Sequence, residues 1–436
     1  MNILYSTYAL ISSGLFLACF PIFWLYTRFK GQYAEGLKER FGYIDSGITQ
    51  YLTGSPRIWI HAVSLGEIKA AESIINSLRT IIPGCSIILS TTTRHGRDLA
   101  NIIFRDKIAV FYSPIDFIPS VRKVLNKLRP DVLVLLETEI WPAWINEARR
   151  MGIKIAMVNG RISSRSYKKY LVFRAFFQSV LGNIDIFSMI TEEDRSRIAS
   201  LGADPGKITV NGNAKYDLLT GMADPSIELE MRRILNLEDH PPVFIAGSTR
   251  SGEESMIVYV YERIIKEFPD TVLIIAPRHI DRIGEIASLL ERYNFRYQLR
   301  SELDSNTVRR VEQVVIIDRF GELFKLYSVG TIIYCGASLV PLGGQNPLEA
   351  AVWGKAILYG PYMEDFLDAK ALLDANSSGI QVSSPEMLAE KVLSLLKDPD
   401  LLKNYGDRAR EAVFRNRNAG ERHARIILDL ISGDKK

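Results

Sequence analysis

The chain has 436 residues, more than one hydrophobic core usually organises, so we expect two soluble domains of roughly 100 to 200 residues each plus extra segments. A composition with 47% hydrophobic and 24% charged residues excludes a largely disordered protein. The formal net charge of +4 is small for this length, so nothing in it requires a nucleic acid as partner.

The first predicted element is an apolar run over residues 3–26, ILYSTYALISSGLFLACFPIFWLY. A helix of this length, at about 1.5 Å per residue, reaches across a hydrocarbon core of about 30 Å. The run lacks the basic start and the cleavage site of a signal peptide, so we predict an uncleaved membrane anchor at residues 1–27. Pro21, Trp24 and Tyr26 leave open a helix that lies in one leaflet.

Basic residues follow this run directly, namely Arg28, Lys30, Lys38 and Arg40. Lys and Arg are enriched on the cytoplasmic side of membrane segments, so we expect the body of the protein on that side. The three cysteines show no pairing pattern, which agrees with a reducing compartment.

The rest of the chain alternates short β-branched runs with longer amphipathic stretches, which predicts an α/β fold with parallel sheets covered by helices. A first Rossmann-like domain over residues 28–217 holds seven predicted strands, at 57–62, 85–92, 108–113, 131–137, 154–159, 185–190 and 207–212. Residues 218–241 form a polar connector. A second Rossmann-like domain over residues 242–436 holds five, at 242–248, 271–277, 314–318, 331–337 and 356–360.

Two open sheets of this kind bind ligands outside the carboxyl ends of their strands, so we expect them to face a cleft. The final helices of the second domain could pack back on the first. Chemistry should therefore concentrate in the loops that follow the predicted strands.

The first such loop is HAVSLGE, from His61 to Glu67, between a strand and an amphipathic helix. Ser64 and Glu67 have the spacing of a capping box, in which Glu67 would only accept the backbone N–H of Ser64. Gly66 lets a substrate approach the backbone, and a shielded carboxylate can act as a general base for a hydroxyl acceptor. The residues alone leave both interpretations open.

The second loop is LLETEIWP, Leu135 to Pro142, where an apolar strand ends in Glu137 and Glu139. Strand alternation would place both carboxylates on one face. An ion pair with Arg161 or Lys215 would explain them structurally, and a functional site would explain why two costly charges lie together.

Two loops of the second domain could bind an anion. AGSTRSGEE, from Ala246 to Glu254, combines a flexible loop, a helix start and Arg250. APRH ends a strand with Arg278, which could bind a phosphate or pair with Asp281.

The most informative stretch is SLVPLGGQNPLEAA, from Ser338 to Ala351. Asn346 fits the position before a helix and Pro347 the first helical residue. Gly343 and Gly344 open the backbone ahead of that helix, which suits a phosphate, and Glu349 could accept hydrogen bonds from ribose hydroxyls.

Other chemistries fit less well. The five histidines are scattered, so no zinc cluster is expected, and neither a G-x-S-x-G elbow nor a Walker motif is present. The D-x-D at Asp398 and Asp400 has the composition of a turn.

With these residues in view, the chain resembles the transferases of 3-deoxy-D-manno-octulosonic acid (Kdo), which are inverting glycosyltransferases of the GT-B architecture that use CMP-Kdo. The stretches HAVSLGE, LLETEIWP, NGRIS, GNAKYD, GSTRSGEE, PRH, FGEL and GGQNPLEAA recur in the family's order and spacing. The similarity covers essentially the whole chain.

The resemblance implies that Glu67 is the general base and that Glu137 and Lys215 stabilise the transition state. It also implies a site for the CMP moiety, made by Pro277, Arg278, Phe320, Gly321, Glu322, Asn346, Pro347, Leu348 and Glu349. Gln345 and Arg250 stand where the family frequently has His, and Gly160 replaces a common Ala. Gln345 cannot titrate near neutral pH, so we expect no proton transfer there.

The activity that the resemblance implies is transfer of Kdo from CMP-Kdo to a lipid A precursor, lipid IVA, in lipopolysaccharide inner-core biosynthesis. The expected location is the cytoplasmic face of the bacterial inner membrane, in contact with membrane lipid, and neither a metal nor another cofactor is expected. Alternatives are another GT-B enzyme that uses a UDP-sugar, as a transferase or an epimerase, and a non-enzymatic membrane-tethered scaffold.

Overall fold

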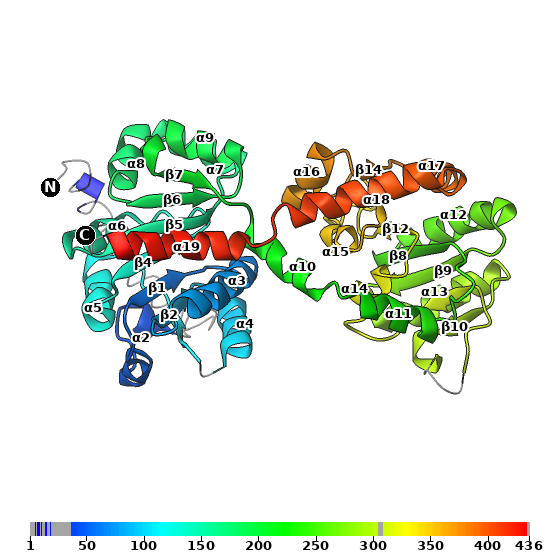
Figure 1. The fold of residues 1–436 in the computed structure, drawn as a ribbon, viewed down its shortest axis with the longest axis horizontal. Helices are drawn as coiled ribbons and strands as arrows, with labels where there is room; N and C mark the ends of the chain where they lie inside the picture. Colours follow the sequence, from blue (N-terminus) through cyan, green and yellow to red (C-terminus); the bar gives the residue numbers. More distant parts are fainter. Residues whose placement is uncertain are drawn as a thin grey trace. The chain divides into compact units, whose positions relative to one another are not determined.

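The computed structural model describes residues 36–105, 107–303 and 308–433, together with residues 5, 7, 8, 10, 14 and 18. It divides into two compact units, one formed by residues 1–218 and 416–436 and the other by residues 219–415 (Figure 1). Apart from those single residues, the predicted anchor at residues 1–27 lies outside the described residues. None of the described helices combines the length and the apolar character that crossing a bilayer requires.

The first unit is built on a parallel sheet of seven strands in the order β3-β2-β1-β4-β5-β6-β7. All seven strands predicted for this domain are present, with ends shifted by at most two residues. The strands are β1 (Arg57–His61), β2 (Ser86–Thr91), β3 (Ala109–Tyr112), β4 (Val132–Leu136), β5 (Lys154–Gly160), β6 (Ile186–Met189) and β7 (Ile208–Val210).

Helices cover both faces of this sheet, because successive residues of a strand point to opposite sides. Ile58 and Ile60 of β1 pack with α3, α4 and α19, whereas Trp59 packs with α5, α6 and α8. The described helical elements of this unit are α2 (Leu37–Arg40), η1 (Ser46–Tyr51), α3 (Leu65–Ile81), α4 (Arg94–Phe104), α5 (Ile118–Leu128), α6 (Pro142–Arg150), α7 (Ser164–Val172), α8 (Arg174–Leu181), α9 (Glu192–Ser200), η2 (Pro205–Lys207), η3 (Ala214–Tyr216) and α19 (Ala419–Ser432).

The last helix, α19, is a part of the first unit although it follows the whole second unit in sequence (Figure 1, red). It packs on α3 and β5. The carboxylate of Asp217 accepts hydrogen bonds from the backbone N–H groups of Ala419 (3.1 Å) and Gly420 (2.6 Å) at the start of this helix. The structure therefore places residues 416–436 with the first sheet.

The second unit has a parallel sheet of seven strands in the order β10-β11-β9-β8-β12-β13-β14. The strands are β8 (Val243–Thr249), β9 (Val272–Pro277), β10 (Tyr297–Leu299), β11 (Val314–Ile316), β12 (Ile332–Cys335), β13 (Ala356–Tyr359) and β14 (Gly379–Gln381). The five predicted strands are confirmed, and the sequence analysis missed β10 and β14. Both are edge strands of three residues, too short and too polar to show a strand pattern.

Helices also cover this second sheet, and β8 and β12 pack on α12 and α17 through alternate residues such as Phe244 and Tyr334. The predicted connector contains α10 (Asp217–Met222), which spans the boundary, and α11 (Pro225–Ile234). The other described helical elements are α12 (Glu253–Glu267), η4 (Ile280–Arg282), α13 (Ile283–Arg292), η5 (Arg300–Glu302), α14 (Leu323–Tyr327), α15 (Leu348–Ala351), η6 (Glu364–Phe366), α16 (Leu367–Ala375), α17 (Pro385–Lys397) and α18 (Pro399–Phe414).

Each sheet has a switch point, where the chain leaves two adjacent strands in opposite directions and opens a crevice at their carboxyl ends. In the first unit the adjacent strands are β1 and β4, and in the second they are β8 and β12. HAVSLGE and LLETEIWP follow the first pair, while GSTRSGEE and the segment leading to GGQNPLEAA follow the second. The fold thus places two of these motifs at the switch point of each sheet.

We predict that Asp217→Ala lowers the free energy of unfolding of the first unit by about 1–3 kcal/mol, because the first N–H groups of α19 lose a charged acceptor. Guanidinium unfolding followed by tryptophan fluorescence measures this, since Trp59 and Trp144 lie in the first core. The control is Asp429→Ala, which removes an exposed acid from the last turn of the same helix. Equal stabilities of the two variants would contradict the prediction.

Candidate functional site

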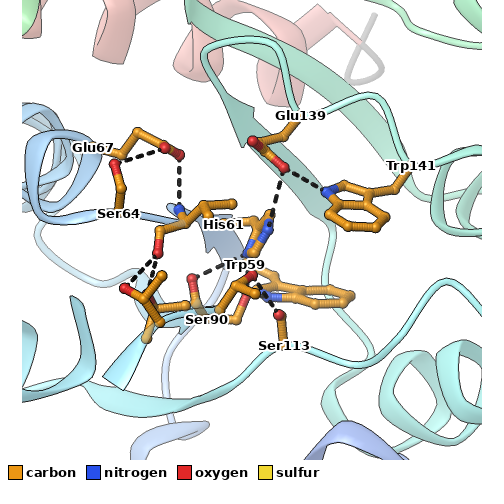
Figure 2. A network of polar contacts seen from close by, with 12 residues as sticks. Trp59, His61, Ser64, Glu67, Ser90, Ser113, Glu139 and Trp141 are labelled. Atoms are coloured by element: carbon orange, nitrogen blue, oxygen red, sulfur yellow. Dashed lines mark hydrogen bonds and ion pairs between the residues drawn. The ribbon is translucent and has the colours of Figure 1, made fainter. Parts of the chain in front are cut away.

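Glu67 lies in the first turn of α3, directly after the carboxyl end of β1, and is 7% exposed. Its Oε2 accepts a hydrogen bond from the backbone N–H of Val63 (2.7 Å), and its Oε1 accepts one from the Ser64 hydroxyl (3.0 Å) (Figure 2). The predicted capping box is therefore wrong in one contact. The backbone N–H that Glu67 accepts is that of Val63 and not that of Ser64. The hydroxyl of Ser64 makes no capping bond to the helix either.

The peptide that holds Glu67 is itself fixed by the neighbouring strand. The carbonyl of Val63 accepts hydrogen bonds from the hydroxyls of Thr91 (3.0 Å), the last residue of β2, and of Thr93 (3.1 Å), in the loop that follows it. The position of the Glu67 carboxylate thus depends on two loops of the sheet. Such fixed geometry is what a proton-transferring group requires.

Burial raises the pKa of Glu67 to about 8, and the negative charge of Glu137 adds to the effect. The hydrogen bond from Val63 opposes the shift, and the charge of Glu139 increases it further. A carboxyl group with a pKa near physiological pH is strong enough as a base and can still be ionised, which is the range for general base catalysis.

Glu137 follows the last residue of β4 and adopts a left-handed backbone, with φ of 53°. Its N–H still donates to the carbonyl of Val158 (3.1 Å) on the neighbouring strand. The strand ends at Leu136, so the predicted alternation does not extend to Glu137 and Glu139, and the turn sets their directions. A non-glycine residue in this conformation is strained, and strain of this kind is common at functional sites.

Glu139 lies against aromatic side chains at the same edge of the sheet (Figure 2). Its Oε2 accepts a hydrogen bond from the indole N–H of Trp141 (2.7 Å) and lies 4.0 Å from Nε2 of His61. Burial raises the pKa of Glu139 to about 7 and lowers that of His61 to about 4. His61 is therefore neutral at physiological pH, and its contact with Glu139 is dipolar instead of an ion pair.

Lys215 lies close to the start of α3, the helix that carries Glu67. It belongs to η3, which packs against α3. A β-carbon added to Gly66 would lie 3.8 Å from Nζ of Lys215 and 3.9 Å from Oγ of Ser64, so the ammonium group stands beside the start of α3. The structure thus brings together the three residues predicted to be catalytic: Glu67, Glu137 and Lys215.

This cluster can remove a proton from a bound hydroxyl group and can stabilise a developing negative charge beside Lys215. The described residues contain no group of three or more His, Cys, Asp or Glu side chains placed to hold a metal ion. Glu139, His61 and Trp141 also belong to this cluster. The second glutamate of the E-T-E sequence is a signal for Glu139, whereas nothing in the motifs marks His61 or Trp141 as site residues.

The residues predicted to bind CMP lie in three loops of the second unit. Pro277 ends β9 and is buried, whereas the side chain of Arg278 is exposed and has no hydrogen bond or ion pair among the described residues. Its backbone N–H donates to the carbonyl of Thr249 (3.0 Å), which ties β9 to the loop after β8. The predicted alternative pair with Asp281 is not formed.

The loop that follows β12 differs in one respect from the prediction. The helix α15 begins at Leu348 instead of Pro347 and has only four residues, so its dipole is too small to attract a phosphate strongly. Oδ1 of Asn346 accepts the N–H of Leu348 (3.2 Å), as expected for a residue that caps a helix. Leu348 and Pro347 are buried, while Asn346 and Glu349 are partly exposed.

The segment FGEL follows β11. Phe320 is 74% exposed, Gly321 has a φ of 83°, and Glu322 forms an ion pair with the buried Arg300 (Nε to Oε2, 3.0 Å). β9, β11 and β12 run parallel, so the three loops leave the same edge of the sheet.

Two positions at which the chain departs from the usual pattern of the family it resembles, Gly160 and Arg250, have local explanations. An added β-carbon at Gly160 would lie 2.5 Å from Sδ of Met189, so this chain has little room for the common Ala. Nη1 of Arg250 donates to Nε2 of His279 (2.5 Å), next to Arg278. Nothing in the structure explains Gln345.

A family model described as "3-Deoxy-D-manno-octulosonic-acid transferase (kdotransferase)" matches residues 35–218. Over 404 residues the chain is 30% identical to the 3-deoxy-D-manno-octulosonic acid transferase of Haemophilus influenzae, with 92% of this chain and 91% of that protein covered. Over 337 residues it is 36% identical to a bifunctional glycosyltransferase/methyltransferase of Fusobacterium nucleatum, with 77% of this chain covered. That match spans 52% of the Fusobacterium protein, so the chain spans about half of its length.

Among solved structures, the UDP-GlcNAc 2-epimerase of Neisseria meningitidis bound to UDP-GlcNAc has a TM-score of 0.55. It is 16% identical, and 86% of this chain and 99% of that chain are covered. At this identity the likeness concerns the fold alone. It confirms the predicted fold class, two Rossmann-like parallel sheets of the GT-B type.

We predict that Glu139→Gln lowers the pKa of Glu67 below about 8, because a neighbouring negative charge is removed while the amide still accepts the Trp141 N–H. A carbon-13 NMR titration of labelled glutamate carboxyl groups in the full chain measures this shift. Glu192→Gln, which removes an exposed carboxylate of the same unit, should leave the Glu67 titration in place. An identical midpoint in the Glu139 variant would show that the two carboxylates do not interact.

Proposed function

The chain belongs to the 3-deoxy-D-manno-octulosonic-acid (Kdo) transferase family, and on this premise we propose that it transfers Kdo from CMP-Kdo to a lipid A precursor. The acceptor in this proposal is lipid IVA, and the reaction is a step of lipopolysaccharide inner-core biosynthesis. We further propose that the enzyme works on the cytoplasmic face of the bacterial inner membrane, held there by the apolar segment at residues 3–26.

The observation that carries this proposal is the buried carboxylate of Glu67, with its raised pKa of about 8, at the switch point of the first sheet. A sugar hydroxyl is a poor nucleophile until a base removes its proton as it attacks. Glu67 is fixed by Val63 and Ser64 and is fit for this step. Glu137 contributes by raising the basicity of Glu67.

In the proposed reaction an acceptor hydroxyl attacks the anomeric carbon of Kdo while Glu67 takes the hydroxyl proton. The bond between the anomeric carbon and the phosphate oxygen breaks, and CMP leaves with the electron pair. A single displacement of this kind inverts the configuration at the anomeric carbon. As this bond breaks, the anomeric carbon becomes electron-poor and negative charge develops on the leaving phosphate. We assign the stabilisation of that negative charge to the ammonium group of Lys215.

The donor binds in the second unit in this proposal. The exposed guanidinium of Arg278 has no partner among the described residues and can place two N–H donors on the CMP phosphate. Glu349 and Asn346 offer polar groups for the ribose or the base. Fixed charge and backbone N–H groups would take over the role that a metal ion has in many other glycosyl transfers, so we propose a metal-independent enzyme.

We predict that Glu67→Gln lowers the turnover number by about 100-fold to 10,000-fold, the range for loss of a general base. The assay is purified full chain with CMP-Kdo, lipid IVA and EDTA, with the products resolved by mass spectrometry. Glu72→Gln, five residues later on the same helix, is the matched control and should keep near-normal turnover. Near-normal transfer by the Glu67 variant would refute the base assignment, and loss of wild-type transfer in EDTA would refute metal independence.

We also predict that Arg278→Ala weakens CMP binding at least about tenfold, because a phosphate loses a charged hydrogen-bond donor. Isothermal titration with CMP, and with UDP for comparison, measures the loss. The control is Arg296→Ala, which removes an exposed Arg elsewhere in the same unit. Unchanged CMP affinity would mean that the donor phosphate binds elsewhere, and a preference for UDP would favour the UDP-sugar alternative.

A further inference from the structure

Glu253 is a fully buried carboxylate at the start of α12, in the stretch GSTRSGEE that follows β8. Its Oε2 accepts the backbone N–H groups of Arg250 (2.9 Å) and Ala337 (2.6 Å). Its Oε1 accepts those of Ser338 (3.0 Å) and Leu339 (3.1 Å), and the phenol of Tyr334 (2.6 Å). One side chain therefore satisfies five donors.

These donors come from two different loops. Arg250 lies in the loop after β8, while Ala337, Ser338 and Leu339 lie in the loop after β12, and the two strands are neighbours in the sheet. A carboxylate with both oxygens surrounded by donors is a strong acceptor, and removing it would leave several buried N–H groups without partners. Glu253 thus joins the two loops at the switch point of the second sheet.

Each of these loops leads to residues of the proposed donor site. On one side, Arg250 contacts His279, and Thr249 accepts the backbone N–H of Arg278. On the other side, the carbonyl of Ala337 accepts the N–H of Gly344 (2.8 Å), two residues before Asn346. Hydrogen bonds therefore connect Glu253 to the segment that carries Arg278 and to the segment that carries Asn346.

The backbone that Glu253 holds is strained and closely packed. Ala337 and Ser248 both adopt left-handed conformations, with φ of 58° and 56°. A β-carbon on Gly336 would lie 2.6 Å from the carbonyl oxygen of Ser248, so the end of β8 and the start of the loop after β12 touch through their backbones. Conformations of this kind persist only where surrounding bonds hold them.

We propose that Glu253 is a positioning residue for the nucleotide site. It fixes the distance between the segment that carries Arg278 and the segment that carries Asn346, without touching the ligand. The inference rests on the proposed function, because it assumes that CMP binds between these loops of the second unit. Loss of the carboxylate would let the loops relax, and the donor groups would no longer be arranged in advance of binding.

The adjacent residue offers a matched control. Glu254 is also buried in the first turn of α12, but its carboxylate pairs with Arg282 (Nη1 to Oε1, 2.6 Å) and receives no hydrogen bond from either loop. A carboxylate that matters only for stability would behave alike at both positions.

The experiment compares Glu253→Gln and Glu254→Gln in the full chain. It measures CMP affinity by isothermal titration, the KM values for CMP-Kdo and for lipid acceptor, and the thermal unfolding midpoint. We expect Glu253→Gln to weaken CMP binding and to raise the KM for CMP-Kdo at least tenfold, with the acceptor KM within twofold of wild type. Glu254→Gln should lower the unfolding midpoint but leave CMP affinity within twofold.

Tyr334→Phe provides a milder variant in case Glu253→Gln does not fold, since it removes one donor to Glu253 and keeps the buried ring. We expect CMP affinity to fall two- to fivefold in this variant. CMP affinity within twofold of wild type in the folded Glu253 variant, or in Tyr334→Phe if the former does not fold, would overturn the inference alone. Equal affinity losses in Glu253→Gln and Glu254→Gln would also overturn it. A wild-type chain that does not bind CMP would overturn the proposed function and the inference with it.

Discussion

In both units a buried carboxylate lies at the start of the helix that follows the first strand in sequence, and the two carboxylates have different surroundings. Within the described part of the chain, Glu67, which follows β1, receives one backbone N–H and one hydroxyl, while two further acids lie near it. Glu253 follows β8 and receives four backbone N–H groups and a phenol. Burial costs both groups hydration, but only Glu253 regains a full set of partners.

This difference fits the two tasks that the proposed reaction sets. A general base must be able to take up a proton near neutral pH, which an ordinary carboxylate does poorly, so the incomplete compensation that raises the pKa of Glu67 is useful. A nucleotide site must be arranged before its ligand arrives, so complete compensation at Glu253 is useful in a different way. The switch point of a parallel sheet provides the same kind of crevice in each case. The number of hydrogen-bond donors that the neighbouring loop gives to the carboxylate determines which of the two roles it suits.

Much of the fold could be predicted from the sequence, because long apolar runs and helix starts have clear patterns. The strands of the first sheet are of this kind, whereas the association of Glu67, Glu137 and Lys215 follows from the family resemblance and not from local patterns. Short-range patterns could not show that β4 ends before Glu137 or that α15 has a single turn. They could not show the role of Glu253 either, since four of its five partners lie more than 80 residues away in the chain.

The return of α19 to the first unit makes that unit discontinuous, and this has a consequence for biosynthesis. Ala419, Ala424 and Ile427 complete the core that Ile58 and Ile60 of β1 begin. During translation the whole of residues 219–415 leaves the ribosome before α19 does, so the second unit can fold while the first still exposes part of its apolar face. A nascent chain at that stage offers a hydrophobic surface to chaperones that the finished protein no longer has.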